Sequence, residues 1–338
     1  MLLSHNSKIT LREEDPLITC IKNNFIFYSM LFISIFLVAC GNEQQSTSNV
    51  NKSEPKEIAE ERVLIDSLGN EVTIPEKPER VIAPYLEDHL VALGITPVAQ
   101  WSVNDGASIQ TYLQDSLKDI PTIPFDLPFE AVTSFNPDLI LIGSPETVEG
   151  GKYEQYNKIA PTYVLGNEEK NWRDKLLKIG EIFGQTDKAN EVLKEYDQQV
   201  KEAKEKIKST VGKQSAAAIW ITNGSIFMVS ETASSGSVLY GDLGLQAPNL
   251  VKEVSESATS DWSSVSLEKL AELDADYLFL INSDKGNGSE MLKDPLWANI
   301  PAVKNGNVFE FDQNTSWLYT GAIANSQIIN EVVKCITK

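Results

Sequence analysis

The middle of the chain carries one long amphipathic segment, which constrains the fold more than any other feature. Across residues 188–208 the apolar side chains recur every three or four positions, the spacing of one face of an α-helix. About 20 residues at about 1.5 Å each give a helix roughly 30 Å long. Its other face is rich in Lys and Glu, as expected of a surface that contacts solvent. One long helix therefore separates two parts of the chain.

On both sides of this helix, short apolar runs alternate with helix-like pieces, the order that produces a mostly parallel sheet covered on both faces. We therefore predict an α/β fold class with two units of similar plan. Before the helix we expect a hairpin at residues 62–74, strands at 80–84, 97–101, 138–142 and 162–165, and helices at 86–93, 129–135, 153–160 and 172–183. After it we expect a hairpin at 216–229, strands at 276–281 and 307–311, and helices at 238–243, 267–273, 291–299 and 322–336.

The first residues indicate an export signal rather than part of the fold. Residues 25–39 are uncharged and follow Lys22, and they are too few for a membrane-spanning helix of about 20 residues. Acidic residues precede Lys22, where a signal peptide would be basic. We therefore assign residues 1–39 to a signal peptide with a mis-started extension.

The boundary Leu37-Val38-Ala39-Cys40-Gly41 resembles the lipobox of bacterial lipoproteins, in which the cysteine receives the lipid. The alternative is an ordinary secretory signal with a chance cysteine. Residues 40–60 are polar and without apolar periodicity, so we interpret them as lipidated Cys40 and a disordered tether. We expect an N-terminal α/β lobe at 61–170, helices including the interlobe helix at 171–210, and a C-terminal α/β lobe at 211–338.

Charge and residue counts exclude several functions. A net charge of −19 repels phosphate backbones, so no nucleic-acid partner is expected. Two His and three Cys are too few for a zinc cluster, an iron–sulfur centre or a disulfide scaffold, so we expect no protein-held metal and no cofactor. The chain has no Gly-x-Ser-x-Gly, and Gly150-Gly151-Lys152 lacks the rest of a phosphate loop. An exported enzyme is therefore the weaker alternative.

Six short segments, taken in their order and spacing, carry a resemblance to a known family. They lie at residues 78–83, 130–142, 159–162, 239–245, 266–268 and 297–303. Over nearly the whole mature chain, the sequence is similar to the substrate-binding lipoproteins of ABC importers in the iron-siderophore and cobalamin group. The resemblance implies a class III periplasmic-binding-protein fold, with two Rossmann-like lobes joined by a single long helix and a ligand in the cleft between them. Because such a helix resists bending, closure should be small.

The resemblance also implies a function. It predicts a lipid-anchored monomer on the extracytoplasmic face of the cell membrane, which captures a ferric siderophore and delivers it to an ABC transporter permease. Glu130 and Glu268, each at the start of a helix in one lobe, match the family's permease-docking carboxylates. The alternative is that both merely complement helix N-termini.

Cleft residues should follow the C-terminal ends of the parallel strands, where loops converge. The chain places four of its six Trp near such points, whereas Trp172 and Trp297 lie in amphipathic helices and should be core residues. Trp262 is left unassigned. The candidate ligand-binding residues are Tyr85, Trp101 and Ser144 in the first lobe and Trp220, Trp317 and Tyr319 in the second.

The shortage of arginine narrows the ligand. Only Arg62, Arg80 and Arg173 follow the tether, and none falls at a predicted cleft position. Ferric catecholates and ferric citrate call for clustered cations, so a hydroxamate is favoured, with Lys118 and Lys152 as remaining sources of positive charge. A cobalamin or haem carrier of the same fold is the alternative. We expect His89, the one histidine of the mature chain, at the surface or the cleft rim.

Overall fold

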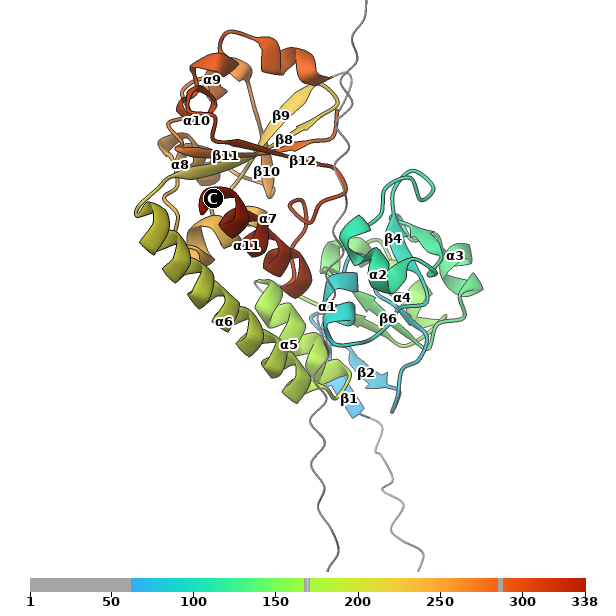
Figure 1. The fold of residues 1–338 in the computed structure, drawn as a ribbon. Coiled ribbons are helices and arrows are strands. Elements are labelled where there is room, and N and C mark those ends of the chain that lie inside the picture. Colours follow the sequence, from blue (N-terminus) through green and yellow to red (C-terminus); the bar gives the residue numbers. More distant parts are fainter. Residues whose placement is uncertain (1–61, 167–168, 170, 285–287) are drawn as a thin grey trace, which may run out of the picture. The chain divides into compact units, whose positions relative to one another are not determined.

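The computed structural model describes residues 62–166, 169, 171–284 and 288–338 (Figure 1). The predicted signal peptide (1–39) and tether (40–60) lie outside these residues, so lipidation of Cys40 stays a prediction. The domain boundaries given above also stay predictions. Below, the first lobe means the elements before α5, and the second lobe means those after α6.

The first lobe opens with a hairpin and continues with parallel strands. β1 (Arg62–Ile65) pairs antiparallel with β2 (Glu71–Ile74). β3 (Val81–Ile82), β6 (Leu139–Ile142) and β7 (Thr162–Val164) form a parallel sheet in the order β3-β6-β7, beside a parallel pair of β4 (Gln100–Ser102) and β5 (Thr122–Pro124). The helices are α1 (Glu87–Ala92), α2 (Gln114–Leu117), α3 (Phe129–Ser134) and α4 (Lys152–Asn157), with 3-10 turns at Thr111–Leu113 and Pro145–Val148.

Two helices connect the lobes. Asn171 caps the N-terminus of α5 (Trp172–Ile182). Its side chain accepts hydrogen bonds from the backbone N–H groups of Arg173 and Asp174. α6 (Thr186–Val211) runs 26 residues and includes the whole predicted segment 188–208. It packs against both α5 and α11, which lie on the same side of α6 in Figure 1. The prediction of one long helix between two α/β units is confirmed.

The second lobe is built on one mixed sheet. β8 (Ala216–Thr222), β11 (Tyr277–Asn282) and β12 (Val308–Asp312) are parallel, and β9 (Ser225–Val229) and β10 (Trp262–Val265) extend the sheet antiparallel, in the order β10-β9-β8-β11-β12. Its helices are α7 (Ser234–Gly236), α8 (Asn249–Glu256), α9 (Leu267–Leu270), α10 (Pro301–Lys304) and α11 (Ala322–Ile336), with a π turn at Ser237–Asp242 and 3-10 turns at Gly288–Lys293 and Trp297–Asn299.

The buried apolar side chains form a core that both lobes share. Side chains alternate across each parallel strand, so Leu139 and Leu141 face the shared core while Ile140 and Ile142 face a core of the first lobe alone. β8 and β11 divide their side chains in the same way between the shared core and a core of the second lobe. α5, α6 and α11 all contribute to the shared core, so the two sheets are joined by packing as well as by the chain.

Several local elements differ from the prediction; α2, α8 and α10 were not predicted, and three further differences have a clear cause. The segment 291–299 is two 3-10 turns rather than one helix, because Pro295 lacks an N–H and disfavours helix at Asp294. β5 escaped prediction because Pro124 argues against a strand, yet β5 pairs only with β4 and so tolerates it. β10 also escaped prediction because two serines interrupt its apolar pattern. Within the residues described, no helix has the length and hydropathy needed to cross a membrane.

Candidate functional site

An open cavity lies at the C-terminal ends of the first-lobe strands. We call it the aromatic cavity; its volume is about 380 Å³. Tyr85 follows β3, Trp101 lies in β4, Phe125 follows β5 and Ser144 follows β6, and all four line the cavity. Parallel strands end at the same edge of a sheet, which is why side chains far apart in sequence meet here. Three predicted residues, Tyr85, Trp101 and Ser144, are therefore brought together.

Two aromatic side chains of this cavity are held unusually far out into solvent. Tyr85 is 50% exposed and Phe125 is 60% exposed, although large aromatic side chains are usually mostly buried. Tyr85 has a φ of 64°, a region that residues with side chains rarely adopt. Its ring meets Trp101 edge-on, with ring centroids 5.1 Å apart. Although half of the Tyr85 side chain is exposed, partial desolvation of its hydroxyl by the surrounding protein, with smaller effects of Tyr319 and Asp261, raises its pKa, so the hydroxyl stays available as a donor.

One lysine and one aspartate flank the same cavity. Lys175 lies in α5, and Asp261 immediately precedes β10. The two residues therefore come from segments on either side of α6 in the sequence. Neither forms an ion pair within 4.0 Å in the part of the chain that the structure describes. Burial raises the pKa of the Asp261 carboxyl, and the charge of Lys175 lowers it in part. Neither residue was predicted from the sequence. The predicted cations Lys118 and Lys152 are exposed and line none of these cavities.

His89 is not the surface or rim residue that we expected. Its side chain is 3% exposed and lies in α1 beneath the aromatic cavity, where it is one of the lining residues. Burial, with a smaller effect of Lys175, lowers the pKa of His89 to about 3, so the ring is neutral at pH 7. Polar residue types usually indicate an exposed helix face, so the sequence predicted His89 at the surface or rim. In the structure this polar face of α1 is buried between the sheet and α5.

The two acidic residues before His89 are buried as well. Glu87 accepts a hydrogen bond from the backbone N–H of Trp101 at 2.7 Å and so holds the cavity wall in place. Burial raises the pKa of Glu87 to about 7, although that hydrogen bond acts against the rise. Asp88 reaches out of the first lobe and accepts hydrogen bonds from the backbone N–H groups of Ile323 and Ala324 at 3.1 and 2.9 Å. Burial raises the pKa of Asp88 to about 6.

A second cavity, of about 250 Å³, lies between a first-lobe loop and the second lobe, and it contains two more predicted residues, Trp220 and Tyr319. Tyr319 lies next to the aromatic cavity as well, because its ring centroid is 6.1 Å from that of Tyr85. The indole of Trp220 donates to the Ser283 hydroxyl at 2.8 Å. Trp220, a predicted ligand-binding residue, is thus half-buried at the wall of a cavity.

Trp317 is a core residue, so its assignment to the cleft was wrong. Its side chain is 0% exposed and stacks on Phe279 with ring centroids 4.7 Å apart. Phe311 packs on it at 5.1 Å, and its indole N–H donates to Glu331 of α11. The loop after β12 folds back between the sheet and α11, a long-range contact that the position of Trp317 in a loop does not indicate.

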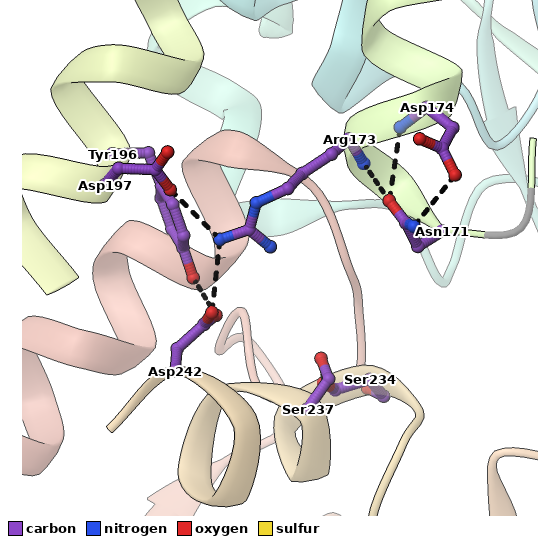
Figure 2. Close-up of polar contacts among 8 residues, drawn as sticks. All are labelled: Asn171, Arg173, Asp174, Tyr196, Asp197, Ser234, Ser237 and Asp242. Carbon is purple, nitrogen blue, oxygen red and sulfur yellow. Dashed lines mark hydrogen bonds and ion pairs between the residues drawn. The ribbon is translucent and has the colours of Figure 1, made fainter. Parts of the chain in front are cut away.

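A third cavity, the polar pocket, has a volume of about 490 Å³ and adjoins the start of α5. Arg173 lines it, although no arginine was expected at a cleft position. Its guanidinium pairs with Asp242 at 3.1 Å and Asp197 at 3.3 Å (Figure 2). It also lies over the rings of Trp172 and Tyr196. Two carboxylates therefore neutralise this cation. The polar pocket shares Lys175, Asp261 and Thr320 with the aromatic cavity.

The two predicted docking carboxylates lie in equivalent local positions. Glu130 is in the first turn of α3 and Glu268 in the first turn of α9, and both are exposed. A backbone N–H and the Ser266 hydroxyl lower the pKa of Glu268. Among the described residues, no group of three or more His, Cys, Asp or Glu is placed to hold a metal ion.

Comparison with known proteins assigns the fold to a family. The profile of the periplasmic binding protein family matches residues 89–315. The chain belongs to this family. Among periplasmic binding proteins, the chain is 29% identical over 317 residues to the iron(3+)-hydroxamate-binding protein FhuD of Bacillus subtilis, covering 92% of this chain and 96% of FhuD. It is 27% identical over 313 residues to the Fe(3+)-citrate-binding protein YfmC of the same organism, covering 90% and 95%.

A solved structure confirms the predicted fold class. The chain is similar, with a TM-score of 0.67 and 27% identity, to a FhuD fold-family periplasmic binding protein component of a Fep/Fec-like ferrichrome ABC transporter from Bacillus subtilis. The similarity covers 81% of this chain and 99% of that one. The fold is therefore the class III arrangement of two α/β lobes joined by a long helix, here α6.

Proposed function

We propose that this periplasmic binding protein captures a ferric siderophore in the aromatic cavity and delivers it to the permease of an ABC importer. The observation that carries the proposal is the pair of outward-facing aromatic side chains, Tyr85 and Phe125, beside Trp101 at the open edge of the first-lobe sheet. Apolar walls with a few polar groups suit a bulky organic chelate. The iron is cargo in this proposal, held by its chelator rather than by protein ligands.

The charges at the cavity favour a hydroxamate chelate. Lys175 is a cation without a carboxylate within 4.0 Å among the residues described, whereas Arg173 is already paired with Asp197 and Asp242. One free cation facing Asp261 gives little attraction for a trianionic catecholate complex, which needs several strong charge-assisted hydrogen bonds. A neutral ferric trihydroxamate needs only aromatic contact and a few hydroxyl donors. The hydroxamate named in the FhuD relative agrees with this choice.

Calorimetric titration of the purified protein tests the ligand class. The probes are ferrioxamine B, a ferric tricatecholate, ferric citrate, cobalamin and haem. We expect saturable binding of ferrioxamine B with a Kd of about 1 μM or tighter, a value reached by specific small-molecule sites of this size. Trp101→Ala should weaken this binding at least about tenfold, equivalent to about 1.4 kcal/mol. Trp297→Phe, in the second-lobe core and away from every cavity described above, is the matched control.

Each alternative has its own outcome. Binding of cobalamin or haem alone would show that the protein has the same fold but carries that ligand instead of a ferric siderophore. Binding of the catecholate alone would overturn the charge argument. Absence of binding by every probe would overturn the proposed function.

Attachment to the membrane is part of the same proposal. Cys40 would carry the lipid, and residues 42–60 would let the binding lobes reach the permease from the extracytoplasmic face. Cys40→Ser should release the protein from the membrane fraction into the medium. Equal amounts of the two proteins in the membrane fraction would contradict the anchor.

A further inference from the structure

The carboxyl group of Glu87 lies behind the wall of the aromatic cavity. Glu87 is buried in the first turn of α1 and accepts a hydrogen bond from the backbone N–H of Trp101, a lining residue, at 2.7 Å. Its other oxygen is buried without a hydrogen-bond partner, and no Lys, Arg or His nitrogen lies within 4.0 Å of the carboxyl in the part of the chain that the structure describes. A negative charge on Glu87 is therefore poorly compensated.

The neighbouring acid is in a different position. Asp88 is buried as well, but it accepts hydrogen bonds from the Tyr112 hydroxyl and from the backbone N–H groups of Ile323 and Ala324. The last two belong to the N-terminus of α11, whose partial positive charge favours a carboxylate. Of the two buried acids, Glu87 thus has the less compensated charge and contacts the cavity wall.

The charge of Glu87 is felt at the aromatic cavity. Burial is the main cause that raises the pKa of the Tyr85 and Tyr319 hydroxyls, and the charge of Glu87 adds to the rise in both. Tyr85 lines the cavity, and its ring centroid lies 6.1 Å from that of Tyr319. A group that disfavours negative charge on these hydroxyls also disfavours a negatively charged ligand beside them.

Glu87 changes its charge in the neutral pH range. Burial raises its pKa to about 7, against the effect of the Trp101 N–H, so the carboxyl is mostly ionised at pH 8.5 and mostly protonated at pH 6. Burial raises the pKa of Asp88 only to about 6, and it lowers the pKa of His89 to about 3. The other titratable or charged side chains around α1 and the cavity are Tyr85, Tyr112, Lys175, Asp261 and Tyr319.

We propose that Glu87 is a specificity-determining residue of the aromatic cavity, and that its negative charge disfavours anionic iron chelates relative to neutral ones. This inference rests on the proposed function, since it assigns a residue that selects among ligands of the same site. Acid should relax the selection, because a protonated Glu87 carries no charge and its carbonyl oxygen can still accept from the Trp101 N–H.

Two probes that differ by one charge measure this selection. The N-acetyl and N-succinyl derivatives of ferrioxamine B share its ferric trihydroxamate, but only the succinyl arm carries a carboxylate, which stays ionised above pH 6. We expect the preference of the wild-type protein for the N-acetyl probe to fall about three- to tenfold from pH 8.5 to pH 6, the effect of two like charges roughly 10 Å apart near a protein surface. Calorimetric titration at several pH values gives the ratio of the two Kd values.

Two substitutions assign the effect. Glu87→Gln removes the charge but keeps an oxygen that can accept from the Trp101 N–H, so it should abolish the pH dependence of the preference. Asp66→Asn is the matched control, because Asp66 is also buried, accepts the backbone N–H groups of Leu68 and Asn70 at 2.9 and 2.8 Å, and lines none of the cavities described above. This control should keep the pH dependence of the wild type.

The outcomes separate this inference from the proposed function. The same pH dependence in Glu87→Gln as in the wild type would overturn the role of Glu87 and leave siderophore capture standing. A wild-type preference that is constant from pH 8.5 to pH 6 would do the same, as would its loss in Asp66→Asn. Failure of both probes to bind the wild-type protein would overturn the hydroxamate assignment together with this inference.

Discussion

The carboxylate of Asp88 in α1 accepts a hydrogen bond from the backbone N–H of Ala324 in α11 at 2.9 Å, across a sequence separation of 236 residues. It also accepts from Ile323 at 3.1 Å and from the Tyr112 hydroxyl at 3.0 Å. A first-lobe side chain thus caps a second-lobe helix of 15 residues, whose N-terminus carries a partial positive charge. Together with α6 and the shared core, this contact gives the lobes a third connection. It therefore supports a cleft that closes little on binding.

Removal of this cap should destabilise the protein. We expect Asp88→Ala to lower the free energy of unfolding by about 1–3 kcal/mol, because buried N–H groups of α11 lose their acceptor. Urea denaturation measures the change. Asp187→Ala removes an exposed carboxylate from the first turn of α6 and should cost less than about 0.5 kcal/mol. Equal costs of the two substitutions would show that the interlobe cap contributes nothing.

Gly321 precedes α11 at a φ of 150°, and a Cβ there would collide with the Asp88 side chain. Gly321→Ala should therefore lower the free energy of unfolding by about 2 kcal/mol or more, through backbone strain and displacement of Asp88. Gly241→Ala adds the same methyl group in open space and should be near neutral. Thermal denaturation of the two variants gives the comparison, and equal midpoints would contradict the close contact.

The buried Glu87 and His89 should give opposite pH dependences of stability. The pKa of Glu87 is raised from 4.5 to about 7, so folding favours its protonated form, and its contribution is lost as the pH rises between these values. The pKa of His89 is lowered from 6.5 to about 3, so folding favours its neutral form. Its contribution is present above pH 6.5 and is lost as the pH falls toward 3.

Each group can be tested by its own substitution. Relative to the wild type, Glu87→Gln should gain stability between pH 5 and 7, by up to a few kcal/mol. At pH 7, His89→Gln should have a lower free energy of unfolding than the wild type, and this difference should shrink as the pH falls from 7 to 4. Unfolding free energies measured across this range check both signs, and parallel curves for all three proteins would contradict both shifts.

Trp317 and Trp101 should respond to substitution in different measurements. Trp317→Ala removes a fully buried indole from between the sheet and α11 and should lower the free energy of unfolding by about 3–5 kcal/mol. Trp101→Ala, at a half-buried cavity wall, should weaken ferrioxamine B binding more than it lowers stability. Denaturation and calorimetry on the same two variants distinguish core from cavity.

Charge reversal of the docking carboxylates should stop uptake without changing ligand affinity. The double variant Glu130→Arg, Glu268→Arg is compared with Glu154→Arg, Glu290→Arg, which reverses exposed carboxylates in first turns of other helices. We expect loss of siderophore-dependent iron uptake only in the first variant. Normal uptake by both would mean that Glu130 and Glu268 only complement their helix N-termini.

Local patterns predicted most of the fold, because the apolar periodicity of a helix or strand is contained in its own residues. The stripe along 188–208 became α6, and the apolar runs ending at Ile142 and Ile281 became the central strands β6 and β11. The cavity residues at strand ends, Tyr85 and Trp101, were also found, since parallel strands end at a common edge. Elements with a mixed pattern, such as β5 and β10, were missed.

The arrangement of charges and the depth of each side chain required the tertiary structure. The sequence did not point to Lys175, and it placed His89 at the surface or the cleft rim; the packing of α5 and α1 beside the first-lobe sheet brings both to the aromatic cavity. Trp317 looked like a loop aromatic until the chain folded it between β11 and α11. The sequence alone determined that the chain builds two α/β lobes around one long helix, because periodicity is a local property. Burial, charge pairing and the site itself depend on contacts between residues far apart in the chain, such as Asp88 and Ala324, and only packing decides those.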